Sequence, residues 1–162
     1  MQSLILKIIG KYNKFKYIKK LYILRLLGAT IHKTVKLHGM IIIKGNPRNL
    51  CIKSNCSLND GVIINCRKKV ILEEGVTISA NVQIHTGALL LNEIPRRHRS
   101  GDVHIGKNVW LAAQCVINPG VIISDGIVVG ANSIVTKSLV EENVFYAGSP
   151  VKKIKKIEYK RN

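Results

Sequence analysis

The chain has 162 residues, 46% of them hydrophobic and 22% charged, which suits one domain with a buried core and excludes a wholly disordered protein. Lysine and arginine number 26 against 9 acidic residues, a formal net charge of +17, which predicts a polyanionic partner such as nucleic acid, anionic lipid, acidic glycan or a phosphorylated cofactor. Aromatic residues make up only 5%, too few to favour stacking on single-stranded bases, so nucleic acid drops in rank.

The cysteines and the apolar segments predict a cytoplasmic protein. No two cysteines form a CxxC pair and all lie among aliphatic residues, which favours buried free thiols over disulfides or zinc ligands. No apolar run is long enough to span a bilayer, and the first ten residues lack the small-residue cleavage site of a secretory signal. The four cysteines are Cys51, Cys56, Cys66 and Cys115.

Residues 1–30 have the pattern of an amphipathic helix that ends near Gly28. Apolar side chains recur at helical spacing, as at Phe15, Ile18 and Tyr22, and seven basic residues with no acid fill the rest of the first 28 positions. Two roles fit this pattern. The helix covers the open end of the fold, or it is a basic anchor that lies on the inner face of the cell membrane.

Residues 31–150 contain a repeat with a period of six. Aliphatic residues occupy every sixth position without a break from Ile105 to Val135, and a second, smaller inward set lies two residues before each of them. An α-helix cannot keep period six on one face, whereas short strands joined by tight corners can. The aliphatic set is Ile105, Leu111, Ile117, Ile123, Val129 and Val135.

The same register occurs earlier in the chain, with two interruptions. It runs from Ile52 to Ile64, slips by two residues at a bulged corner around 67–69, and resumes from Leu72 to Ile84. Between Ile84 and Ile105 the segment 87–101 breaks the period and is expected to be a loop extruded from the coil. The predicted fold is therefore an all-β solenoid. Its basic tail, residues 151–162, is predicted to form a short helix that closes the other end.

Four ordered motifs in residues 103–157 resemble the hexapeptide-repeat acyltransferases of the left-handed parallel β-helix fold. They are Ile105 to Trp110, Asn118-Pro119-Gly120, Gly130 to Lys137 and Ala147 to Pro150. The resemblance is strongest to sugar and polysaccharide O-acetyltransferases of the maltose, galactoside and colanic-acid type. It implies a homotrimer that binds acetyl-coenzyme A (acetyl-CoA) in a groove between coils and takes its sugar acceptor near the loop, with no metal.

The resemblance also implies residues for the acetyl donor. Main-chain groups at Ala113 and Ala131 would bind the pantetheine arm, and Thr136 and Lys137 would lie beside the coenzyme. Lys152 and Lys153 match the place where such proteins hold nucleotide phosphates, a role that suits a lysine point charge. A solvated basic tail is the alternative for these two lysines.

Transfer of an acetyl group from a thioester to a sugar hydroxyl needs a general base, most often histidine. The family pattern places this histidine three residues after a threonine, just inside the loop. The matching threonine is Thr86, but Leu89 stands at the histidine position and cannot accept a proton. A neighbouring histidine has taken the role, the register within the loop differs, or the activity has been lost or changed.

Three histidines near the loop are candidates for the base. His85 follows inward-facing Ile84, so alternation points it outward at the base of the loop, and it ranks first. His98 ranks second, since three nearby arginines would favour its neutral, proton-accepting form. His104 also faces outward beside the loop, and a role as an ordinary surface residue fits it as well as a role as the base.

Outward side chains near the loop are candidates for acceptor binding. By resemblance Trp110 would line the acceptor and thioester pocket, although packing in a trimer interface would explain a lone outward tryptophan equally well. Arg96, Arg97 and Asn92 lie in the loop. The arginines suit the carboxylates of an acidic glycan, or else they form a solvated surface.

These observations predict an acetyl-CoA-dependent O-acetyltransferase that modifies a sugar hydroxyl of a surface polysaccharide or its precursor. Three alternatives stay open. The first is N-acetylation of an amino sugar or nucleotide sugar on the same scaffold. The second is a zinc enzyme of the carbonic anhydrase type, using His85, His98 and His104. The third is a non-catalytic scaffold or membrane-associated binding protein.

Overall fold

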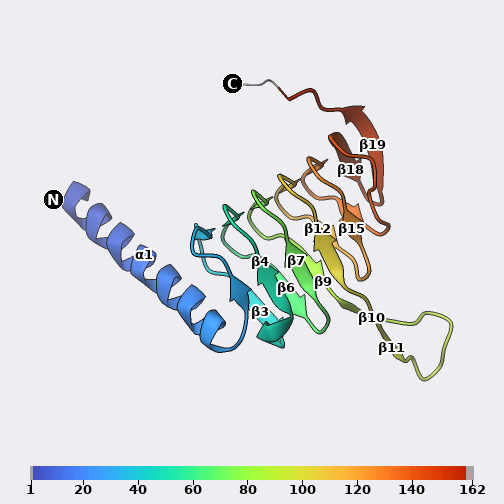
Figure 1. The fold of residues 1–162 in the computed structure, drawn as a ribbon, viewed down its shortest axis with the longest axis horizontal. Helices are drawn as coiled ribbons and strands as arrows, with labels where there is room; N and C mark the ends of the chain where they lie inside the picture. Colours follow the sequence, from blue (N-terminus) through green and yellow to red (C-terminus); the bar gives the residue numbers. More distant parts are fainter. Residues whose placement is uncertain (1, 160–162) are drawn as a thin grey trace.

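The computed structural model describes residues 2–159 as one long helix followed by a left-handed parallel β-helix (Figure 1). Each turn of the coil contributes one short strand to each of three sheets, and five complete turns are present. Sheet A contains β1 (Thr30–Ile31), β4 (Leu50–Ile52), β7 (Val70–Leu72), β12 (Val103–Ile105) and β15 (Ile122–Ile123). Sheet C contains β3 (Ile42–Gly45), β6 (Ile63–Cys66), β9 (Gln83–His85), β14 (Val116–Ile117) and β17 (Ile134–Val135).

Sheet B is longer because the end of the chain adds two strands to it. It contains β2 (Lys36–Leu37), β5 (Ser57–Leu58), β8 (Thr77–Ile78), β13 (Trp110–Leu111), β16 (Val128–Val129), β18 (Val144–Gly148) and β19 (Val151–Lys156). Neighbouring strands within the coil are parallel, whereas β18 and β19 pair in antiparallel fashion at the end of sheet B.

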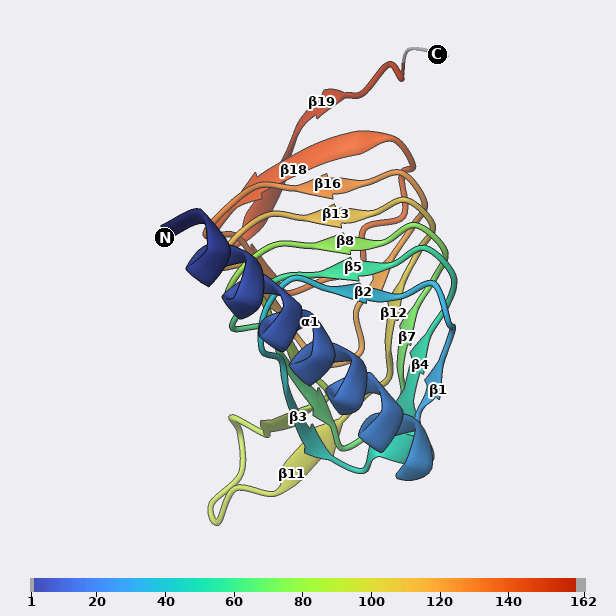
Figure 2. The ribbon, with the colours of Figure 1, turned by 90° about the vertical axis from the view of Figure 1, so that its left-hand side faces the viewer.

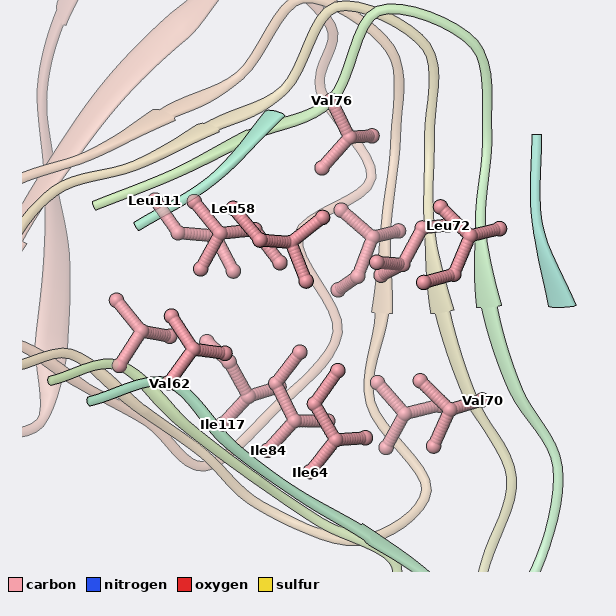
Figure 3. Close-up of a cluster of buried hydrophobic side chains, with 14 of the residues drawn as sticks. Leu58, Val62, Ile64, Val70, Leu72, Val76, Ile84, Leu111 and Ile117 are labelled. Atoms are coloured by element: carbon pink, nitrogen blue, oxygen red, sulfur yellow. The ribbon is translucent and has the colours of Figure 1, made fainter. Parts of the chain in front are cut away.

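The interior of the coil is the aliphatic ladder that the period of six predicts (Figure 3). In sheet C, for example, Ile84, Ile117 and Val135 stack in register, and all three are fully buried. The smaller inward set is also buried, including Cys115 and Ser133. The first turn lies within the range 31–150 predicted for the β-helix, and the short helix Pro47–Asn49 lengthens the corner that separates it from the register starting at Ile52.

Helix α1 (Gln2–Leu26) covers the open first turn, as expected for a cap (Figure 2). Leu21 and Leu24 are buried in the same cluster as Ile31 and Val35. The helix ends where the sequence predicts: Gly28 has a φ of +96°, its N–H donates to the Arg25 carbonyl, and the Ala29 N–H donates to the Leu24 carbonyl. Both bonds together form a Schellman motif, in which glycine is favoured.

The predicted C-terminal helix is wrong, since β19 (Val151–Lys156) is a strand. The cationic tail forms a strand because β18 presents an unpaired edge at the end of sheet B that a returning strand satisfies. Gly148, with a φ of +109°, starts the reversal, and its N–H donates to the Ser133 hydroxyl at 3.0 Å. Residues 160–162 of the predicted tail lie outside the described residues.

The segment expected as an extruded loop is a β-hairpin at its base. Strands β10 (Gly87–Leu89) and β11 (His98–Ser100) pair in antiparallel fashion, and a longer loop joins them. Figures 1 and 2 show the hairpin projecting from the side of the coil, away from the solenoid axis. The bulged corner expected at 67–69 is present next to it, between β6 and β7.

All four cysteines are free thiols, and three of them are buried as expected. Burial raises the pKa of both Cys56 and Cys66 to about 11, so these thiols stay protonated near neutral pH. Cys51 is an exception to the predicted burial because it faces outward from β4 and is only half-buried.

Candidate functional site

A cavity of about 650 Å³ lies where the hairpin leaves the coil. Its walls come from three successive turns: the end of β3 and the residue after it, the end of β6 with the following corner, and both strands of the hairpin. The lining residues are Lys44, Gly45, Asn46, Asn65, Arg67, Gly87, Ala88, Leu89 and His98.

Hydrogen bonds tie this corner of the coil to both ends of the hairpin. The Thr86 side chain is fully buried; its hydroxyl donates to the Asn65 carbonyl at 2.6 Å and accepts from the Lys68 N–H at 3.0 Å. At the other end, the Lys69 N–H donates to a carboxylate oxygen of Asp102 at 3.0 Å. Thr86, the threonine of the family motif, therefore positions two walls of the cavity.

A row of outward side chains crosses sheet C beside the cavity. Lys44, Asn65 and His85 follow an inward isoleucine in three successive turns, and the strand register pairs Lys44 with Asn65 and Asn65 with His85. Lys44 and Asn65 line the cavity, whereas His85 lies next to it. The row was not predicted from the sequence. Asn65 and His85 each directly follow a ladder isoleucine of the repeat, and this signal was available, whereas Lys44 lies in the first turn, before the register that starts at Ile52.

His85 is half-buried and oriented by a neighbour. Its Nε2 lies 3.1 Å from Oε1 of Gln83 on the same strand. Burial, and secondly the positive charge of Lys44, lower the pKa of His85, so the imidazole is neutral at pH 7. A neutral ring with one nitrogen held by the Gln83 amide has its other nitrogen free to accept a proton.

His98 lies directly opposite Leu89 in the hairpin, and both residues line the cavity. The Leu90 N–H donates to the Arg97 carbonyl and the Gly101 N–H to the Thr86 carbonyl. The pattern of antiparallel bonds thus makes Leu89 and His98 a non-hydrogen-bonded pair, the type whose side chains approach each other most closely on one face. The structure therefore brings an imidazole to the side of the position where the family motif has its histidine.

His104 lies on a different sheet. It belongs to β12 of sheet A, where its Nε2 is 3.0 Å from Oε1 of Glu73, whose other oxygen pairs with Lys53. Among residues 2–159 there is no group of three or more histidine, cysteine or acidic side chains placed to hold a metal ion. The three histidines considered for zinc are thus not brought together within the described chain.

The other residues predicted to bind the acceptor lie outside the cavity of a single chain. Trp110 is on sheet B with 47% of its surface exposed, and its Nε1 donates to the Ser79 hydroxyl at 3.0 Å. Arg96, Arg97 and Asn92 are exposed beyond the paired part of the hairpin. Arg97 forms an ion pair with Glu93.

The residues predicted for the acetyl donor lie at the edges of sheets B and C. Ala113 and Ala131 occupy the same corner in successive turns, where the Ala113 carbonyl accepts from the Asn132 N–H at 2.9 Å. Thr136 and Lys137 are exposed just after β17, at the opposite edge of sheet C. On β19, Lys152 is exposed, and Lys153 Nζ lies 2.7 Å from both carboxylate oxygens of Glu141. Their role in binding the coenzyme stays a prediction.

Comparison with known proteins agrees with this architecture. The family model for bacterial transferase hexapeptide (six repeats) matches residues 102–137. The galactoside O-acetyltransferase of Escherichia coli (strain K12) is 36% identical over 112 residues, which are 68% of this chain and 52% of that protein. The chain spans only a little over half the length of several such relatives.

Two solved structures share the fold. The maltose O-acetyltransferase from Clostridium difficile 630 has a TM-score of 0.81 and 32% identity, covering 88% of this chain and 77% of the other. A galactoside acetyltransferase solved in complex with coenzyme A has a TM-score of 0.66 and 24% identity, covering 89% and 82%. The repeat, the coil and the maltose O-acetyltransferase match together show that the chain belongs to the hexapeptide-repeat transferases.

Proposed function

We propose that the protein is an acetyl-CoA-dependent O-acetyltransferase that modifies a sugar hydroxyl of a surface polysaccharide or its precursor. The observation that carries this proposal is the cavity at the base of the hairpin, where a histidine lies beside the family's catalytic position. The relatives in the comparison act on galactosides and maltose by name, which supports a sugar as the acceptor.

The base that the geometry favours is His98, because it lines the cavity and faces Leu89. As general base, its imidazole takes the proton of the sugar hydroxyl as the oxygen attacks the thioester carbonyl. The C–O bond forms, the C–S bond breaks, and the departing thiolate of coenzyme A recovers the proton from the imidazolium. Backbone N–H groups near the hairpin are suitable donors for the oxygen that becomes negative in between.

His85 is the second candidate for the base, and it differs from His98 in being oriented by the protein itself through Gln83. It is adjacent to Thr86 in sequence and pairs with Asn65 in the sheet, so a small displacement of the acceptor would allow His85 to accept the hydroxyl proton. Single replacement of each histidine by alanine separates the two: the base is the one whose loss lowers kcat by about 10²-fold or more.

We also propose that the enzyme acts as a homotrimer, in which a neighbouring copy completes the site. In one chain Trp110 is on sheet B, while the cavity opens between sheet C and the hairpin. A second copy that packs its sheet B against this region would supply the indole. Light scattering should give three times the mass of the chain, and a monomer with full activity would contradict this arrangement.

The N-terminal helix supports a further proposal, contact with the inner face of the cell membrane. Tyr12, Phe15 and Leu26 are each about two-thirds exposed on the side of α1 that faces away from the coil. Twelve basic residues precede the first acidic residue, Asp60, so this end attracts anionic lipid. No helix within residues 2–159 is long and apolar enough to cross a membrane. Cosedimentation with anionic vesicles, abolished by Phe15→Glu, is the expected result.

The experiment that tests the proposed activity is coenzyme A release from acetyl-CoA with a panel of saccharides, followed by NMR of the product. An O-acetyl ester on a sugar ring is the expected product. An amide on an amino sugar would replace the proposal with N-acetylation, and coenzyme binding without any turnover would indicate a non-catalytic binding protein.

A further inference from the structure

The cavity at the hairpin is lined by basic side chains and contains no acidic one. Lys44, Arg67 and His98 contribute to its walls, and the remaining lining residues are neutral. Within the described residues the ion pairs involve other cations, so neither Lys44 nor Arg67 is neutralised by a carboxylate of its own chain. Glu93, in the loop of the hairpin, does not line the cavity and forms an ion pair with Arg97.

Arg67 is held in place by contacts that leave its charge unpaired. Its carbonyl accepts from the Asn49 side-chain amide at 3.2 Å, and the bonds of Thr86 fix the segment on either side of it. Its stem passes over Gly87: a Cβ added there would lie 3.3 Å from Cδ and 3.8 Å from Nη1 of Arg67. The exposed guanidinium therefore lies on the hairpin side of the cavity.

Lys44 supplies a second charge on the adjoining wall. It is exposed at the end of β3, one position along the row from Asn65, and its field reaches His85 strongly enough to lower the pKa of that ring. These groups suit a sugar that carries one anionic group and several hydroxyls. The guanidinium of Arg67 can bind two oxygens, Lys44 adds a point charge, and the neutral amide of Asn65 lies between them.

We infer that Arg67 and Lys44 bind the anionic group of an acidic sugar acceptor, with Arg67 as the main contact. This inference rests on the proposed function, because it takes the cavity as the acceptor site. It names the acceptor class as a sugar with a carboxylate, such as a uronic acid, or an equivalent acidic substituent. The hydroxyl to be acetylated would then face His98.

A matched pair of acceptors tests this inference. Methyl β-glucuronide and methyl β-glucoside differ in the charged group, and KM for each is measured with wild type and with Arg67→Gln. We expect the wild type to have the lower KM for the glucuronide, and Arg67→Gln to raise the glucuronide KM by about 10-fold or more relative to the glucoside KM, so that the preference for the charged sugar is lost. Arg67→Lys should recover part of the loss.

The control is Lys68→Gln, which removes the same charge one residue away without touching the cavity. It should leave both KM values unchanged. An equal effect of the two variants would show that only the overall charge matters and would overturn the inference. So would a rise in the KM for acetyl-CoA alone in Arg67→Gln, because the arginine would then serve the phosphates of the coenzyme.

Direct binding keeps this inference separate from the proposed activity. NMR titration of the protein with each methyl glycoside, without acetyl-CoA, should show tighter binding of the glucuronide and a loss of that preference in Arg67→Gln. If no saccharide of the panel is acetylated but this preference is present, the transferase proposal fails and the anion site stands. If the two sugars bind alike, the anion site is refuted whatever the turnover.

Discussion

The coil and the hairpin are built on different principles, although they lie next to each other in the sequence. In the coil, one aliphatic residue every sixth position is buried against its counterpart in the next turn, as Ile84, Ile117 and Val135 are. In the hairpin nothing repeats, and His98 to Ser100 are all exposed. Stability is thus concentrated in the interior ladder, and chemistry is left to outward side chains on a scaffold that does not need them.

The largest expected effect of breaking this division is on catalysis. His98→Ala should lower kcat/KM by about 10²- to 10⁴-fold, because the hydroxyl loses its base. The midpoint of denaturant unfolding should stay unchanged, since the side chain is exposed. Steady-state kinetics and urea unfolding measure the two. A loss of stability comparable to the loss of rate would show that the hairpin is structural.

The converse change in the ladder should affect stability. Ile117→Ala removes a fully buried side chain between two others and should cost about 2 to 5 kcal/mol of unfolding free energy. The matched control, Ile122→Ala, removes the same atoms from the outer face of sheet A, where half of the side chain is exposed. It should cost far less. Equal losses in urea unfolding would contradict the assigned core.

Thr86 belongs to both regions, so its replacement should give an intermediate result. Thr86→Val keeps the volume but leaves the Asn65 carbonyl and the Lys68 N–H without their buried partner, a cost of about 1 to 3 kcal/mol. Because the same bonds position Asn65 and Arg67, acceptor KM should rise as well. Thr77→Val on sheet B is the control, and an unchanged KM in Thr86→Val would show that the cavity wall is held by other contacts.

The smallest effect concerns the electrostatics of the row across sheet C. Lys44→Gln removes a positive charge that disfavours the protonated ring, so the pKa of His85 should rise. It should stay below the usual value because burial, the larger cause, is unchanged. An NMR titration of the imidazole protons measures this, and a fall in the pKa would show that Lys44 does not face His85.

The division between coil and hairpin also explains what could be predicted from the sequence. The burial of the aliphatic residues from Ile105 to Val135 could be predicted because every hexad places its aliphatic side chain in the same environment. The first turn lies within residues 31–150, the range predicted for the β-helix, but the register from Ile52 onward does not extend back to it because the corner at Pro47–Asn49 interrupts the period. The tail was assigned wrongly because β19 is held by the edge of β18, a partner that local spacing does not reveal.

The candidate site was harder to predict because its parts come from three turns of the coil. Lys44, Asn65 and Arg67 are far apart in sequence from His98, and only the register of sheet C and the pairing of the hairpin bring them to one cavity. The sequence indicates His98 as a candidate base, but its placement opposite Leu89 depends on where the hairpin turns. Loop length and turn position are not encoded by a repeat.

The most direct test of the proposed base exchanges the two facing residues of the hairpin. In the double variant Leu89→His with His98→Leu, the imidazole returns to the family position on the same face of the same cavity. Coenzyme A release with a saccharide acceptor should recover at least about tenfold over the single variant His98→Leu. A double variant no more active than His98→Leu, or a His98→Leu enzyme as active as the wild type, would contradict the assignment.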